Sequence, residues 1–210
     1  MQNNKRDSCI RCGTCCVKGG PTLHHEDKDI LRAGYVRHEH LVTIRKGELM
    51  FDPRVNALCP TDREMIKIRG KGSRWTCRFF DEANSTCTIY EHRLLECRLL
   101  KCWDPAELLS VIGKDTIVRA DIINPGDPVL ALIAAHEQEC PVHEVNELIE
   151  GLSTAADNAT ILARLTHLTR QDQAIRAYAV SELGLSMEYS FFVFGRPLSQ
   201  ILSAHGISIR

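Results

Sequence analysis

The stretch CIRCGTCC, Cys9 to Cys16, places four thiols within eight residues and makes two of them adjacent. The C-x2-C spacing allows a tight turn to direct two thiolates at one metal centre. Two such spacings overlap here, and Gly13 between them supplies a permissive backbone. Three sulfurs from one loop can bind an iron–sulfur cluster. Alternatively, two of them can bind zinc while the other sulfurs of the loop contact other partners. Because Cys15 and Cys16 are adjacent, we expect their side chains to face different partners.

A second group of cysteines follows at wider spacing, Cys77-x9-Cys87-x9-Cys97-x4-Cys102. Together the two groups offer eight thiols, enough for two four-thiolate sites, for one cluster plus one zinc, or for one cluster with spare structural thiols. The bacterial ferredoxin run C-x2-C-x2-C-x3-C-P agrees with the first three cysteines only. The pattern therefore predicts metal binding and leaves open which metal is bound.

The remaining cysteines and the histidines are less informative. Cys59 and Cys140 are each followed by proline, as a closing cluster ligand can be, but a small buried apolar role is favoured for both. His24 and His25 follow a Gly/Pro turn and are candidates to line a metal pocket, with an ordinary loop position favoured. The chain contains no H-E-x-x-H, Walker, G-x-G-x-x-G or G-x-S-x-G motif and no C-x3-C-x2-C triplet. The enzyme classes that depend on those motifs are not expected.

The charge is divided unevenly along the chain. The total is −1, but residues 1–105 carry 19 − 14 = +5 and residues 106–210 carry 7 − 13 = −6. The predicted hairpin is basic, and a solvated strand face explains it better than a nucleic-acid site, so no nucleic-acid partner is expected. Cations beside thiolates also offset the negative charge of a cysteine-ligated centre. The basic side chains of the hairpin are Lys67, Arg69, Lys71, Arg74 and Arg78.

The start of the chain, MQNNKRDSCI, has no apolar signal segment. No run approaches the roughly 18 apolar residues that a membrane span requires. We therefore expect a cytoplasmic protein without membrane association. In that reducing compartment, ten cysteines indicate metal ligands before they indicate disulfides.

The hydrophobic pattern predicts an α+β fold. Residues 65–80 alternate and turn at Gly70-Lys71-Gly72, which is typical of a hairpin, and Thr88-Ile89-Tyr90 is expected to add a short strand. Residues 91–102 have helical spacing around Cys97, and the pattern is nearly all helical from about residue 142. We expect an irregular cysteine-rich metal-binding domain over 1–105 and a mostly helical region over 106–210 packed against it. The apolar run at 191–194 suits a core element or a homodimer interface equally.

Several of these stretches resemble a known family. CIRCGTCC, KGGPTLH, CRFF from Cys77, CTIYEHR from Cys87 and the Cys97-Arg98 pair are similar to the CxxCxxCC zinc- or iron-chelating domain, the YkgJ-like cysteine-cluster proteins. The resemblance covers about residues 6–105, and the chain departs from the family pattern at Leu94, where proline is usual. It implies metal ligation by Cys9, Cys12, Cys15, Cys16, Cys77, Cys87 and Cys97, to which the spacing adds Cys102. A similar cluster occurs in flagellin lysine-N-methylase, where it is thought to carry an iron–sulfur centre.

Three functions remain open. The first is a metal-binding protein holding an iron–sulfur cluster, with 4Fe-4S favoured over zinc, for electron transfer or redox sensing. The second is an enzyme with an open position on the centre, for example for methyl transfer to a protein side chain or a small molecule. Its acid–base groups would come from His24, His25, Glu26 or Asp81, none of which is singled out. The third is a structural zinc module that binds a partner through its helices. The partner, protein or small molecule, is not identified by the sequence.

Overall fold

The computed structural model describes residues 9–72, 75–153 and 158–209. The chain divides into two units, each described by itself below. Unit 1 comprises Met1–His40 and Lys67–Ile117, and unit 2 comprises Leu41–Ile66 and Val118–Arg210. Short hairpins and short helices in the N-terminal region, followed by a mainly helical C-terminal region, confirm the predicted α+β class. The division into domains at residue 105 stays a prediction.

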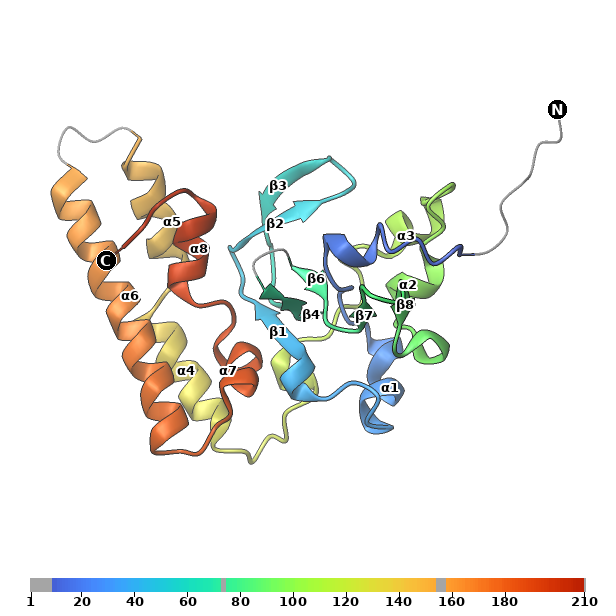
Figure 1. The fold of residues 1–210 in the computed structure, drawn as a ribbon. Coiled ribbons are helices and arrows are strands. Elements are labelled where there is room, and N and C mark those ends of the chain that lie inside the picture. The colour runs from blue at the N-terminus through green and yellow to red at the C-terminus, as the bar shows by residue number, and fades with distance from the viewer. Residues whose placement is uncertain (1–8, 73–74, 154–157, 210) are drawn as a thin grey trace, which may run out of the picture. The chain divides into compact units, whose positions relative to one another are not determined.

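Unit 1 is built from short elements joined by loops (Figure 1). Its 3-10 helices are η1 (Cys16–Lys18), η2 (His25–Asp27), η3 (His38–His40) and η5 (Tyr90–His92). Its α-helices are α1 (Lys28–Arg32), α2 (Leu95–Leu99) and α3 (Ala106–Val111). Its strands are β5 (Gly70–Lys71), β6 (Thr76–Cys77), β7 (Phe80–Asp81) and β8 (Thr86–Cys87), together with the end of β4 (Met65–Ile68). Elements this short cannot bury much apolar surface individually, so they depend on one another for stability.

Two small antiparallel hairpins place cysteines at defined positions in unit 1. In one, β5 pairs with β6 so that Gly70 lies opposite Cys77, and in the other β7 pairs with β8 so that Phe80 lies opposite Cys87. A hairpin is present within the predicted stretch, but the predicted turn at Gly70-Lys71-Gly72 is wrong: Gly70 and Lys71 are strand residues paired with β6, and Met65–Ile68 pairs with β1 instead. Trp75 adopts φ 58° and breaks the expected alternation before β6. The prediction of a strand at 88–90 is wrong. The strand ends at Cys87, and Tyr90 begins a 3-10 helix instead.

The helix carrying Cys97 is shorter than its spacing suggested. Leu94 precedes it with φ −64° and ψ 160°, an extended conformation that separates η5 from α2. This φ is the value that proline imposes, and Arg93 before it is extended as well, at ψ 139°. The departure from the family pattern at Leu94 therefore keeps the proline-compatible backbone, while the leucine side chain is 1% exposed and adds to the core.

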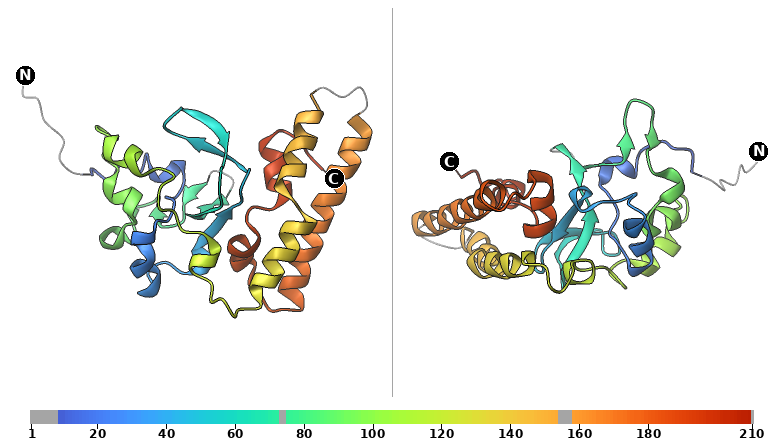
Figure 2. Two further views of the ribbon diagram at one scale, coloured as in Figure 1. Left: turned by 180° about the vertical axis from the view of Figure 1, so that it is seen from behind. Right: turned by 90° about the horizontal axis from the view of Figure 1, so that it is seen from below.

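Unit 2 combines two small sheets with five longer helices. Its strands are β1 (Leu41–Ile44), β2 (Leu49–Asp52) and β3 (Ala57–Pro60), with the start of β4; β1 pairs with β4, and β2 pairs with β3. After the 3-10 helix η6 (Arg119–Asp121) come α4 (Val129–Glu139), α5 (Val142–Gly151), α6 (Asn158–Ser181), α7 (Met187–Phe194) and α8 (Leu198–Ala204). The long helix α6 contacts α4, α5, α7 and α8, and Figure 2 shows from two further directions that it runs beside α4 and α5. No helix in the described residues is long and apolar enough to cross a membrane.

The apolar run at 191–194 belongs to the core of unit 2. It lies in α7, which contacts β1, and Phe192, Val193 and Phe194 are each 0% exposed. The Thr43 hydroxyl donates a hydrogen bond of 2.5 Å to the Phe192 carbonyl and ties the helix to the strand. The core interpretation therefore accounts for these three residues.

A buried guanidinium connects several segments of unit 2. Arg119 is 5% exposed, and its backbone and side chain both bond to the Glu64 carboxylate, with Nη2 2.5 Å from Oε2. Its other contacts are Glu137 at 2.7 Å and the Val193 carbonyl. Arg119 thereby holds the loop before β4 to α4 and α7.

We predict that Glu64→Ala will destabilise the protein by about 3 kcal/mol, because removing one partner of a buried pair leaves the other charge poorly compensated. Urea unfolding checks this result. The matched control is Glu107→Ala, which removes the exposed partner of Lys101 and should change stability little. Equal effects of the two variants would contradict the role given to Arg119.

Candidate metal centre

The thiols of unit 1 that converge come from four parts of the chain. The N-terminal loop supplies Cys15 and Cys16, strand β6 supplies Cys77, strand β8 supplies Cys87 and helix α2 supplies Cys97. The 3-10 helix η1, which starts at Cys16, packs directly on β6. No disulfide joins any of the ten cysteines, all of which the structure describes. The fold therefore gathers thiols that are up to 82 residues apart (97 − 15) without a covalent link between them.

The thiols are close enough to shift one another's pKa values. Burial raises the pKa of Cys97, and the thiols of Cys77, Cys15 and Cys87 raise it further. Burial likewise raises the pKa of Cys77, with contributions from Cys87 and Cys15. The Cys15 and Cys16 sulfurs are 3.9 Å apart, and their shared proton lowers the pKa of Cys15 and raises that of Cys16. In the absence of a cation, the buried members of this group are held as neutral thiols.

A close contact seats the cysteine loop on the domain. Gly13 has φ 75°, and a Cβ atom at this position would lie 2.3 Å from Cζ of the Phe80 ring. Phe80 is 5% exposed and pairs with Cys87 across the β7–β8 hairpin. The absence of a side chain at Gly13 therefore lets the loop approach the strand pair that carries Cys87.

We predict that Gly13→Ala will be more destabilising than Gly34→Ala, by roughly 1–3 kcal/mol, the usual cost of overpacking. Both glycines have similar positive φ values, 75° and 79°, but nothing lies within 4 Å of a Cβ at Gly34. The control thus carries the same backbone strain without the contact. Urea unfolding of both variants at equal metal content measures the difference, and equal losses would show that the Phe80 contact has no energetic role.

The other predicted ligands are exposed, as Cys15 is. Cys9 and Cys12 are exposed; the Cys9 sulfur accepts a 3.4 Å hydrogen bond from the Arg11 N–H, and the Thr14 hydroxyl lowers the pKa of Cys12. Cys12 also couples to Cys15. Cys102 is exposed in the turn after α2. The predicted set of eight ligands therefore divides into two parts. The inner group consists of Cys15, Cys16, Cys77, Cys87 and Cys97, and the outer members are Cys9, Cys12 and Cys102. Ligation by each of them stays a prediction.

Two buried carboxylates hold α2, and with it Cys97. Asp27 is 0% exposed and accepts hydrogen bonds from the N–H groups of His24 (2.9 Å) and Leu95 (2.8 Å), so it caps the helix. Glu96 accepts from the Thr22 N–H at 2.7 Å and lies 3.4 Å from Nε2 of His24. Burial disfavours the charged form of both residues. The hydrogen bond and the charge of each partner outweigh burial, so the pKa of His24 is raised and the pKa of Glu96 is lowered, and both shifts favour the ion pair. His24 therefore positions α2 from inside the core.

The remaining acid–base candidates have structural partners. Glu26 pairs with Arg98, and Asp81 accepts hydrogen bonds from Asn84 and from the N–H of Ala83 in the hairpin turn. His25 is exposed in η2.

The basic side chains of the hairpin are also partly engaged. Lys67 donates to the Thr22 hydroxyl at 3.2 Å, and Lys71 donates to the Phe80 carbonyl at 2.7 Å. Lys71 also lowers the pKa of Cys77, which places this cation beside the thiol group. Arg74 lies outside the described residues.

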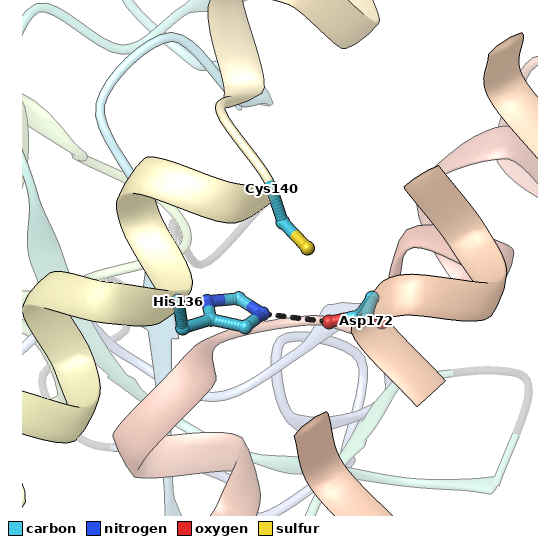
Figure 3. A group of neighbouring side chains, drawn as sticks. All are labelled: His136, Cys140 and Asp172. Atoms are coloured by element: carbon cyan, nitrogen blue, oxygen red, sulfur yellow. Dashed lines mark hydrogen bonds and ion pairs between the residues drawn. The ribbon is translucent and has the colours of Figure 1, made fainter. Parts of the chain in front are cut away.

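A second group of possible ligands lies in unit 2 and was not predicted as a set. Within the described residues, the donor atoms of His136, Cys140 and Asp172 all lie within 4.8 Å of one another, and all three residues are 0% exposed. Figure 3 shows the Cys140 sulfur directed toward the space where Nε2 of His136 meets Asp172. His136 and Cys140 have i, i+4 spacing at the end of α4, a signal visible in the sequence, but Asp172 on α6 is not.

This second group is already bonded without a metal. Asp172 receives hydrogen bonds from His136 (2.7 Å) and Arg176 (2.9 Å) at Oδ1 and from the Leu198 N–H (3.0 Å) at Oδ2. Burial, together with Asp172, raises the pKa of Cys140 to about 12, which keeps the thiol neutral. A dication here would displace a hydrogen bond and face the Arg176 guanidinium. We therefore interpret the group as a buried polar network that joins α4, α6 and the start of α8.

We predict that Asp172→Asn will lower the free energy of unfolding by about 3 kcal/mol, because two buried donors lose their charged acceptor, and that the metal content per chain will not change. Urea unfolding and elemental analysis measure the two quantities. Glu144→Gln, which removes the exposed partner of Arg164, is the control and should have a much smaller effect. Loss of one metal equivalent in Asp172→Asn would show instead that the group ligates a metal.

The cysteine-rich unit and its thiols define the class as a cysteine-cluster protein. Residues 8–110 match the sequence model of the CxxCxxCC family, described as a "putative zinc- or iron-chelating domain". This match confirms the resemblance over those residues. Comparison with curated proteins and with solved structures gives no match.

Proposed function

We propose that unit 1 holds one polynuclear iron–sulfur centre through the inner thiols and uses it for electron transfer or redox sensing. The observation that carries the proposal is the convergence of thiols from the N-terminal loop, β6, β8 and α2. These thiols belong to the domain whose family is described as chelating zinc or iron. An all-sulfur donor set is the set preferred by iron–sulfur clusters and by zinc.

The spacing of the sulfurs favours the larger centre. Four thiolates at about 2.3 Å from one zinc ion lie about 3.8 Å from each other. The one group of three close donor atoms found within the described residues is that of unit 2, and it contains no thiol of unit 1. The sulfurs of the adjacent Cys15 and Cys16 lie 3.9 Å apart. A centre wider than a single ion suits thiols arranged in this way.

The residues of the chain define what the protein would contribute to such a centre. The inner ligands would be Cys15 or Cys16, Cys77, Cys87 and Cys97, with Cys9, Cys12 and Cys102 as outer members of the predicted set. A bound cluster would supply one-electron redox chemistry. Because the buried thiols are otherwise neutral, metal loading must release protons, and it should also stabilise a unit built from such short elements.

Anaerobic purification followed by iron, zinc and sulfide analysis tests this proposal. We expect iron and acid-labile sulfide in equal amounts and a coloured protein. Cys97→Ser should lose most of the metal, because this ligand comes from the helix that Asp27 and Glu96 fix in place. The matched control is Cys59→Ser on β3 of unit 2, which should keep the full metal content. A colourless protein with stoichiometric zinc and no sulfide would replace the redox proposal by a structural zinc module.

A further inference from the structure

Two arginines stack on one tyrosine beside the cysteine loop. The guanidinium carbon of Arg11 lies 4.3 Å from the centroid of the Tyr90 ring, and that of Arg93 lies 3.9 Å from it. Each distance is well inside the range of about 6 Å for a cation–π interaction.

The stack connects the loop to the segment that leads into α2. Arg11 stands between Cys9 and Cys12, has φ 56°, and donates its N–H to the Cys9 sulfur. On the other side, Arg93 Nε donates to the Tyr90 carbonyl at 2.9 Å. The backbone carbonyl of Arg93 in turn accepts a hydrogen bond of 2.7 Å from the side chain of Arg98, the residue that follows Cys97. A contact through the Tyr90 ring thus spans the two segments that carry the first and the last predicted family ligands.

The two positive charges of the stack have no carboxylate partner among the residues that the structure describes. Within the described residues, neither Arg11 nor Arg93 forms an ion pair with Asp or Glu, although Arg98 next to them pairs with Glu26. Two cations on one neutral ring repel each other, so the arrangement gains from negative charge nearby. Deprotonated cysteines at a metal centre supply that charge.

We propose that Arg11, Tyr90 and Arg93 are positioning residues for the thiolate centre: the ring holds the cysteine loop in place, and the two guanidinium charges favour the anionic, metal-loaded state. This inference rests on the proposed function. It gives a role to Tyr90 and Arg93, which no predicted ligand set includes, and to an arginine within the cysteine loop itself.

The test uses the full chain, stripped of metal under reducing anaerobic conditions and titrated with Zn²⁺ against a competing chelator. Arg11→Gln should weaken binding about threefold at low salt, and the difference should vanish in about 1 M salt, where the Debye length is about 3 Å. Tyr90→Leu should weaken binding about tenfold at both salt concentrations, as loss of an outer-shell partner does. Tyr90→Phe should keep the affinity of the wild type, because the ring faces remain. Arg32→Gln, an exposed arginine of α1, is the control for removal of a positive charge.

Hydrogen exchange of residues 9–16 supplies a second readout that does not depend on metal. Faster exchange in Tyr90→Leu, with wild-type exchange in Tyr90→Phe, is expected from the positioning role. Wild-type affinity for Arg11→Gln at low salt, or a loss that is the same at both salt concentrations, would overturn the electrostatic part. Unchanged exchange in Tyr90→Leu would overturn the positioning part. A wild-type chain that binds no Zn²⁺ through its cysteines would overturn the thiolate site that this inference assumes, whereas the proposed iron–sulfur centre fails separately if the purified protein lacks iron and sulfide.

Discussion

The buried carboxylate of Asp27 is the interaction on which the rest of unit 1 depends. It is inaccessible to solvent, and it accepts one hydrogen bond from the turn at His24 and another from the first residue of α2. A five-residue helix has too few internal hydrogen bonds to be stable alone. Capping by Asp27, and the bonds of Glu96 to Thr22 and His24, give α2 a fixed place in the core. The position of Cys97 follows from that placement.

The remaining thiols are placed by similarly small devices. The loop reaches the hairpins because Gly13 leaves room for the Phe80 ring, and the two-residue strands set Cys77 and Cys87 opposite Gly70 and Phe80. None of these elements has the apolar area to fold strongly by itself. Unit 1 therefore resembles small domains that use a bound metal as part of their stability, whereas unit 2 has a conventional core around α6.

Parts of the fold and site follow from local sequence pattern, and other parts do not. Local patterns in the sequence predicted the cysteine-rich region, the helical C-terminal half and a hairpin near Cys77. The end of the strand at Cys87, the φ of Trp75 and the extended Leu94 depend on packing with distant segments, so local periodicity misled for the strand at 88–90 and for the length of α2. The bond between His136 and Asp172 joins residues 36 positions apart, and no spacing rule finds it. Which thiols approach each other is likewise a tertiary property.

We propose that sulfur alone, from the loop, the hairpins and α2, surrounds the metal. X-ray absorption spectroscopy at the edge of the metal found in the purified protein tests this claim most directly. The account predicts a first shell made of sulfur and a second shell from a neighbouring metal atom of the same cluster. A first shell with imidazole or carboxylate donors, as the His136, Cys140 and Asp172 group would provide, would contradict it.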